Sequence, residues 1–148
     1  MNLWKLWIVH ELLSQRAPGA EGDAVRPGLL HASMDGMTDD VTQIEVGALP
    51  LTFDDSVVLL DVREPDEWQR GHVAGAQHIP LGDVPARIDE IDRDATLYVI
   101  CHAGGRSQRV AQYLARNGFE PTNVTGGMLS WAQAGRPMST DDGNAGTV

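Results

Sequence analysis

The sequence predicts an α/β fold in which an open parallel sheet has helices on both faces. Short apolar runs alternate along the chain with segments of helical periodicity, and this order is typical of such sheets. The run at residues 57–60 is apolar throughout and rich in β-branched side chains, as a parallel strand buried on both faces is. The 148 residues suffice for one domain with a real core and are too few for two.

The elements follow from local patterns along the chain. Residues 42–46 alternate polar and apolar side chains, as a half-buried strand does. Further strands are expected at 57–60, 77–80, 96–100 and 121–124. Pro65 begins a helix, because proline presets the first helical turn and the acids Asp66 and Glu67 suit its positive end. Further helices are expected at 84–91, 106–117 and 128–134. Gly118 ends the second of these with a left-handed cap.

Three segments differ in composition. Residues 41–138 have the pattern of a compact domain. Residues 1–40 form an N-terminal extension and linker, disordered or weakly helical, in which an apolar start is followed by a stretch rich in Gly, Pro, Ala and acids. Residues 139–148 are polar and contain glycine, which predicts a disordered C-terminal tail.

Two interpretations of the apolar start remain open. It is either a segment that docks on a partner or on the domain itself, or an upstream extension of a chain whose natural start is Met34 or Met37, and we favour the second. Lys5, His10 and Glu11 interrupt the apolar run too early for a secretory signal or a membrane span.

Charge and cysteine content exclude several classes of function. The formal net charge of -10 argues against nucleic acid as a partner and gives no reason to expect an anionic membrane. One cysteine permits neither an internal disulfide nor a zinc cluster, and this fits a reducing compartment such as the cytoplasm. Residues 95–119 contain no acid and three arginines, of which Arg109 and Arg116 are interpreted as solvated helix residues and Arg106 as a site residue.

The cysteine stands where the strand at 96–100 is expected to meet the following helix. The first N–H groups of that helix have no carbonyl partner and point into the loop. Gly104 and Gly105 let this loop turn tightly enough to bring several amides inward as an anion-binding nest. The helix dipole, these amides and the cation of Arg106 all favour an ionised, reactive Cys101. A lone cysteine at a strand end is otherwise a small buried hydrophobe, which needs no Gly-Gly-Arg-Ser sequence behind it.

Residues 101–107 fit the pattern C-x-x-G-x-R-S and resemble the active-site loop of the rhodanese family of sulfurtransferases. Other stretches resemble the upstream and closing signatures of that family: Leu60-Asp61-Val62-Arg63-Glu64, Glu67-Trp68, Gly71-His72-Val73, Gly75-Ala76, His78-Ile79-Pro80, Gly126-Gly127, Trp131 and Gly135-Arg136-Pro137. The resemblance covers residues 57–138 in the right order. It implies a rhodanese-like open parallel sheet and a single-domain sulfurtransferase without cofactor or metal.

The resemblance also implies roles for the loop residues. Cys101 is the expected catalytic nucleophile, and the residues expected to bind the transferred sulfur are His102, Ala103, Gly104, Gly105, Arg106 and Ser107. The Cys101 thiolate would take sulfane sulfur from thiosulfate or from a persulfide donor, hold it as a persulfide, and pass it to a thiol acceptor. Donor and acceptor are small molecules or proteins. Because the chain has no second cysteine, the acceptor must come from outside.

The resemblance assigns framework roles to other polar residues. Asp61 and Arg63 are interpreted mainly as supports of the loop framework, and His72 occupies a position that the family uses for packing. The family usually has a helix after the first strand, and here residues 47–55 are short and carry Pro50, so a turn is expected instead.

Three alternatives assign a different function. Phosphatases and arsenate reductases of this fold need five residues between cysteine and arginine, whereas Cys101 and Arg106 are separated by four, and arsenate reduction in addition usually needs a second thiol. A non-catalytic or persulfide-carrier module would use the same loop, although inactive members of the family typically lose the cysteine. A plain structural domain has no need of the intact loop. The transferase is therefore favoured, with the carrier as its alternative.

Overall fold

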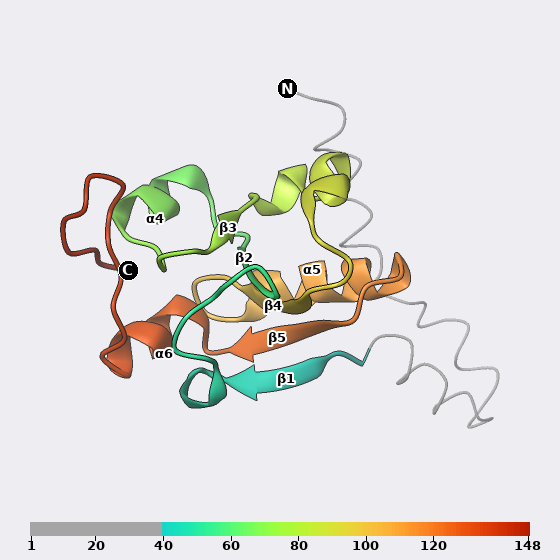
Figure 1. Cartoon of the computed structure of the whole chain (residues 1–148), viewed down its shortest axis with the longest axis horizontal. Helices are drawn as coiled ribbons and strands as arrows, with labels where there is room; N and C mark the ends of the chain where they lie inside the picture. Colours follow the sequence, from blue (N-terminus) through green and yellow to red (C-terminus); the bar gives the residue numbers. More distant parts are fainter. Residues whose placement is uncertain (1–39) are drawn as a thin grey trace, which may run out of the picture.

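The computed structural model describes residues 40–148, so the interpretation of the apolar start lies outside the described residues. Its centre is a five-stranded parallel sheet in the order β1-β5-β4-β2-β3 (Figure 1). The strands are β1 (Thr42–Glu45), β2 (Val57–Asp61), β3 (Gln77–His78), β4 (Thr96–Ile100) and β5 (Pro121–Thr125). The α-helices are α4 (Pro65–Arg70), α5 (Gly105–Arg116) and α6 (Gly127–Gln133), and the 3-10 helices are η1 (Val46–Ala48), η2 (Leu81–Asp83) and η3 (Pro85–Glu90).

The sheet has an apolar core on each face, which confirms the predicted fold class. The successive residues Leu59 and Leu60 of β2 are fully buried and belong to different cores, because neighbouring side chains of a strand point to opposite faces. One core receives Val110 and Leu114 from α5, and the other receives Trp131 from α6. The two helices that flank the central strands are thus held by apolar packing on opposite faces.

The remaining helical segments are short. The helix expected at residues 84–91 is the 3-10 helix η3, in which Arg87 has non-helical dihedral angles. Its hydrogen bonds span three residues, from Arg87 N–H to the Val84 carbonyl and from Ile91 N–H to the Ile88 carbonyl, and the kink at Arg87 divides it into two short 3-10 turns. The turn expected at 47–55 is confirmed in part by η1. No helix in the described part of the chain is long and apolar enough to cross a membrane.

Residues 139–148, expected to be a disordered tail, have backbone partners in the structure. Ser139 pairs antiparallel with Ala145, and Gly146 N–H donates to the Met138 carbonyl, so that residues 138–147 form what we call the C-terminal hairpin. The hairpin, dark red in Figure 1, lies beside α4. Its contacts are made largely by backbone groups, and a polar, glycine-containing composition does not reveal such pairing.

Candidate active site

Cys101 lies directly after the central strand β4, at the carboxyl edge of the sheet. Strands β2 and β5 flank β4, and ligands of open α/β sheets bind beyond this edge. The thiol is free and its residue is 1% exposed. The Gly104 N–H donates to the Cys101 Sγ over 3.1 Å, so the loop already presents one amide to the sulfur. This is the place that the sequence predicts for Cys101.

The start of α6 fixes the first two peptides of the Cys101 loop. Met128 N–H donates to the Cys101 carbonyl over 2.8 Å, and Leu129 N–H donates to the His102 carbonyl over 3.0 Å. A trans peptide points its N–H opposite to its carbonyl, and no described peptide bond is cis. The N–H groups of His102 and Ala103 therefore point away from α6, toward the inner side of the loop.

A buried polar network fixes the peptide between Gly104 and Gly105. The Gly104 carbonyl accepts hydrogen bonds from Gln108 N–H (3.2 Å), from the Ser107 hydroxyl (3.3 Å) and from the Asn123 side-chain amide (3.5 Å). The Ser107 hydroxyl also donates to Asn123 Oδ1 over 2.6 Å. Because this carbonyl is turned into the protein, the Gly105 N–H faces the opposite way. The first backbone N–H of α5 that binds a carbonyl one turn back is that of Gln108. The N–H groups of Gly105, Arg106 and Ser107 precede it and have no helix carbonyl to bind.

The network continues from Asn123 to the edge of the sheet. Asn123 is 3% exposed and donates through Nδ2 to Gln43 Oε1 over 2.8 Å, and Gln43 Nε2 donates to Gln108 Oε1 over 2.6 Å. Ser107 itself is fully buried, so its side chain supports the loop from below and does not line its mouth. The Ser107 side chain thus lies behind the loop, and the group predicted to bind the sulfur at this position is the backbone N–H.

Two glycines allow the close approach of the loop and the β5–α6 turn. Gly104 has φ of 107°, in the left-handed region that favours glycine, and a Cβ there would lie 3.3 Å from Gly126 N. Gly127 has φ of 57°, and a Cβ there would overlap the carbonyl oxygens of Cys101 and His102. Gly127 is therefore required by the carbonyl contacts that orient the loop.

Arg106 is bound by a carboxylate from another element. Its guanidinium donates two hydrogen bonds to Glu67 of α4, over 2.8 and 2.9 Å. The hydrogen bond from Arg106 is the main cause that lowers the pKa of Glu67 from 4.5 to about 2. The same hydrogen bond is the main cause that raises the pKa of Arg106, with a smaller contribution from the charge of Cys101. The cation that the sequence predicts beside the thiol is therefore paired with Glu67.

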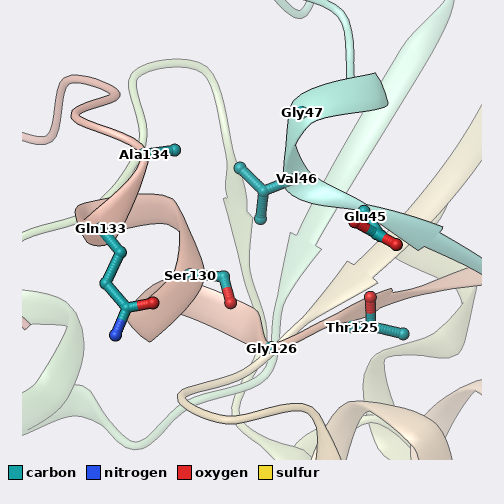
Figure 2. Close-up of a pocket in the computed structure, with 8 residues that line it drawn as sticks. All are labelled: Glu45, Val46, Gly47, Thr125, Gly126, Ser130, Gln133 and Ala134. Carbon is teal, nitrogen blue, oxygen red and sulfur yellow. The ribbon is translucent and has the colours of Figure 1, made fainter.

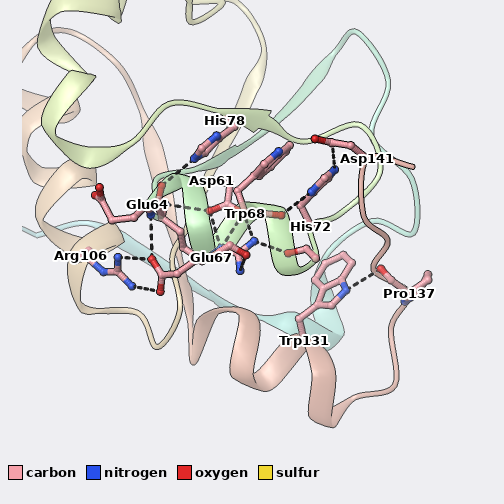
Figure 3. A network of polar contacts seen from close by, with 12 residues as sticks. Asp61, Glu64, Glu67, Trp68, His72, His78, Arg106, Trp131, Pro137 and Asp141 are labelled. Atoms are coloured by element: carbon pink, nitrogen blue, oxygen red, sulfur yellow. Dashed lines mark hydrogen bonds and ion pairs between the residues drawn. The ribbon is translucent and has the colours of Figure 1, made fainter. Parts of the chain in front are cut away.

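Asp61 and Arg63 hold the framework behind this pair. Arg63 is 1% exposed and binds both carboxylate oxygens of Asp61, with the shortest distance 2.7 Å. Its guanidinium also donates to the carbonyls of Gly71 (2.8 Å) and Glu67 (3.3 Å). His72 is largely buried and stacks on Trp68 (Figure 3). These three polar residues occupy framework positions in the structure.

A hollow of about 370 Å³ lies between the ends of β1 and β5 and helix α6. Figure 2 shows Glu45 and Thr125 at the ends of neighbouring strands, with Ser130 and Gln133 of α6 across from them. Gly126 lines the hollow and also lies against Gly104 of the loop. Cys101 does not line it. Within residues 40–148, no group of three His, Cys, Asp or Glu side chains could hold a metal ion.

Sequence reasoning missed three supports of the loop. The sequence indicates Glu67 only as a residue at the start of a helix and as part of a family signature. Nothing in its spacing from Arg106 indicates that the two side chains are in contact. The amides of Met128 and Leu129 are backbone groups without a sequence signal. Asn123 did have one, because an amide side chain in a short buried strand requires a hydrogen-bond partner.

Comparisons with known proteins bear on this geometry. A family model described as Rhodanese-like domain matches residues 49–134, more than half of the chain. The chain is 33% identical over 133 residues to the putative sulfur carrier protein YrkF of Bacillus subtilis, covering 88% of this chain and 72% of YrkF. It is 37% identical over 99 residues to the thiosulfate sulfurtransferase GlpE of Pseudomonas putida, covering 66% of this chain and 89% of GlpE.

A solved structure has the same fold. The crystal structure of SSP1007 from Staphylococcus saprophyticus superposes with a TM-score of 0.56 at 38% sequence identity. The match covers 60% of this chain and 90% of SSP1007.

Proposed function

This chain belongs to the rhodanese-like domain family, and we propose that it is a sulfurtransferase that carries sulfane sulfur on Cys101. The observation that carries the proposal is the set of anchored peptides around a buried thiol. Gly104 N–H binds the Sγ, and three loop carbonyls are bound from behind, which turns the amides of His102, Ala103 and Gly105 away from their anchors. The similarity to a thiosulfate sulfurtransferase supports the same activity.

The transfer proceeds in two balanced steps. The Cys101 thiolate attacks the outer sulfur of thiosulfate, the S–S bond of the donor breaks, and sulfite leaves with its electron pair. The product is a Cys101 persulfide whose terminal sulfur carries the negative charge. An acceptor thiolate then attacks that terminal sulfur, and the Cys101 thiolate is released as the leaving group. A persulfide donor reacts in the same way and releases a thiolate.

The loop stabilises the charge that this chemistry creates. Preorganised N–H groups act on a developing anion without reorganisation, and one such donor contributes about 2.7–4 kcal/mol in acyl-transfer enzymes. The amides of the 101–107 loop would serve the terminal sulfur in this way. Both partners come from outside the chain, because Cys101 is its only cysteine. We place the reaction in the cytoplasm, where Cys101 is kept as a free thiol, with no role for nucleic acid or membrane.

Intact-mass measurement after incubation with thiosulfate tests the proposal. The native chain should gain one sulfur atom, lose it on reduction, and the Cys101→Ser variant should gain none. If the native chain gains no sulfur while iodoacetamide alkylates Cys101 readily at neutral pH, the thiolate forms and the proposed donor is wrong.

A persulfide carrier is the second candidate, favoured by the 33% identity to a putative sulfur carrier protein. Turnover separates the two functions. A transferase passes sulfur from thiosulfate to cyanide or a small thiol through many cycles. A carrier becomes loaded once and releases its sulfur only to a particular partner, so that single-cycle loading without multiple turnover would favour it.

A further inference from the structure

Helix α4 carries Glu67 but is weakly anchored by packing. It has six residues, and none of them is fully buried. Polar contacts hold it in place: Glu64 and Glu67 form a capping box at its start, and Arg63 binds the carbonyls of Glu67 and Gly71. The position of the Arg106 guanidinium, which Glu67 binds, therefore depends on the other contacts that hold α4 in place.

The C-terminal hairpin contacts the end of α4 through its backbone. His72 and Ser139 exchange two hydrogen bonds of 3.0 Å, in which each N–H donates to the carbonyl of the other residue. Thr147 N–H donates to the Arg70 carbonyl over 2.9 Å. These bonds attach the hairpin to the last residue of α4 and to the chain that follows it.

Two facing glycines show how closely the hairpin is fitted. A Cβ on Gly71 would lie 2.6 Å from Thr147 N, and a Cβ on Gly146 would lie 2.6 Å from Gly71 Cα. Real Cβ atoms do not approach backbone atoms so closely. Gly71 has φ of 165°, which any residue can adopt, so its requirement for glycine comes from this contact.

Side chains extend the contact into α4 (Figure 3). Asp141 Oδ1 lies 3.2 Å from His72 Nε2, and His72 Nδ1–H donates to the Trp68 carbonyl over 2.9 Å. The His72 ring stacks on Trp68 with centroids 3.7 Å apart, and His78 also stacks on Trp68 at 4.6 Å. Trp68 is the neighbour of Glu67, so the hairpin reaches the Arg106 partner through a continuous series of contacts.

We propose that the C-terminal hairpin is a positioning element of the active site, which holds α4 so that Glu67 keeps Arg106 beside the Cys101 loop. The hairpin lies beyond residues 49–134, the part matched by the family model. The proposal assigns a role at the site of the proposed function and rests on it for its meaning. Its physical content, the placement of a cation near the Cys101 thiol, is measurable without sulfur transfer.

Two variants disrupt the hairpin in different ways. A chain that ends at Met138 lacks it but keeps the buried members of both cores, the last of which is Trp131. Gly146→Val keeps the full length and forces the hairpin away from Gly71. Gly47→Val is the matched control, because a Cβ on Gly47 meets nothing within 4 Å and the residue has no positive φ.

The readout is the rate at which iodoacetamide alkylates Cys101 across neutral pH, measured beside sulfur loading from thiosulfate. If the Arg106 guanidinium is no longer held near Cys101, the thiolate becomes less favoured. Both hairpin variants should therefore be alkylated about fivefold more slowly at neutral pH, an effect of the size that coupled groups show. Gly47→Val should react as the native chain does. Urea unfolding of each variant verifies that it is folded.

Repeating the comparison in a Glu67→Gln chain tests whether the hairpin acts on Cys101 through Glu67. If the hairpin acts through Glu67, Gly146→Val should change alkylation by less than about twofold in that background. Equal effects of Gly146→Val in both backgrounds, or native alkylation by both hairpin variants, would overturn the proposal. A native chain that is alkylated but takes no sulfur would refute the proposed donor chemistry instead, and the alkylation comparison would still decide the role of the hairpin.

Discussion

Glu67 connects α4 to the Cys101 loop by one carboxylate, and its charge has a defined pH window. Its pKa is lowered from 4.5 to about 2, first of all by the hydrogen bond from Arg106. Because the folded pKa lies below the unfolded one, the ionised carboxylate stabilises the fold above pH 4.5, and this contribution is lost as the pH falls toward 2. The Arg106 side chain is 36% exposed, so solvent screening limits the effect.

The Glu67→Gln variant removes this negative charge. We expect this variant to lower the free energy of unfolding by about 1–2 kcal/mol at neutral pH and by little near pH 2, where the native carboxylate is about half protonated. Urea unfolding at both pH values measures the difference. Glu120→Gln removes an exposed carboxylate and should change stability by less than about 0.5 kcal/mol. An equal loss at both pH values would show that the shape of the side chain matters and its charge does not.

Asn123 supports the loop from below, and its replacement tests that support. Asn123→Ala leaves the buried Ser107 hydroxyl with only the longer bond to the Gly104 carbonyl, and it removes the donor to Gln43 Oε1 and one donor to the Gly104 carbonyl. We expect a loss of about 1–3 kcal/mol in stability, as for other buried groups left without partners, and slower loading of sulfur on Cys101. Thr122→Ala, a half-buried neighbour on the other face of β5, is the control. Loading at the native rate in a destabilised Asn123→Ala chain would limit the network to folding.

At the scale of elements, α6 acts on the site through its first turn. Its amides bind the Cys101 and His102 carbonyls, and Gly127 makes room for them. Gly127→Ala adds a methyl group that overlaps both carbonyl oxygens, so we expect at least about 1–3 kcal/mol of destabilisation. We also expect sulfur loading to become slower by about tenfold or more, since the loop N–H groups would no longer point at the transferred sulfur. Denaturant unfolding and the loading rate measure the two effects.

Gly135→Ala is the control for backbone strain. Gly135 also has a positive φ, of 73°, but a Cβ there meets nothing within 4 Å. The substitution should cost about 1–2 kcal/mol from the left-handed conformation alone and leave loading unchanged. If Gly127→Ala loaded sulfur as fast as Gly135→Ala, the carbonyl contacts of α6 would have no part in the reaction.

The main elements could be predicted because each has a local physical signal. The apolar run at 57–60 is the buried strand β2, Pro65 begins α4, and Gly118 follows α5 with φ of 91°. The C-terminal hairpin could not be predicted, since the backbone bonds that attach it to Arg70 and His72 join residues far apart in the chain. The 3-10 turns of η3 could not be predicted for a different reason: Pro85 stands at the start of the segment, where a regular α-helix accepts proline as well.

The site could be predicted at its centre and less well around it. The pattern of residues 101–107 places Cys101 at the end of a strand with glycines behind it, and the structure agrees. What binds Arg106 and Ser107 depends on α4 and β5, which approach the loop only in the folded chain. Sequence spacing within one loop therefore indicates the chemistry, and the long-range pairs decide where each charge is held.

At the scale of the whole molecule, acids outnumber bases and the net charge is -10. The arginines described at the site do not offset this net negative charge with their full positive charge, because each is paired with a carboxylate. Arg106 is paired with Glu67, and Arg63 is paired with Asp61 behind the loop. An anion that approaches Cys101 therefore meets a molecule that repels it at long range, and its attraction begins only at short range, at the loop amides and the Arg106 guanidinium.

This charge distribution predicts the response of sulfur loading to salt. The Debye length falls from about 30 Å at 0.01 M salt to about 10 Å at 0.1 M, which screens long-range repulsion but leaves contacts at the loop nearly intact. We expect the second-order rate of loading by the thiosulfate dianion to rise by about two- to fivefold over that range. Alkylation of Cys101 by uncharged iodoacetamide is the control and should respond much less. A loading rate that falls steadily with salt would mean that arginines near the loop, such as Arg109 on α5, attract the donor more strongly than the net charge repels it.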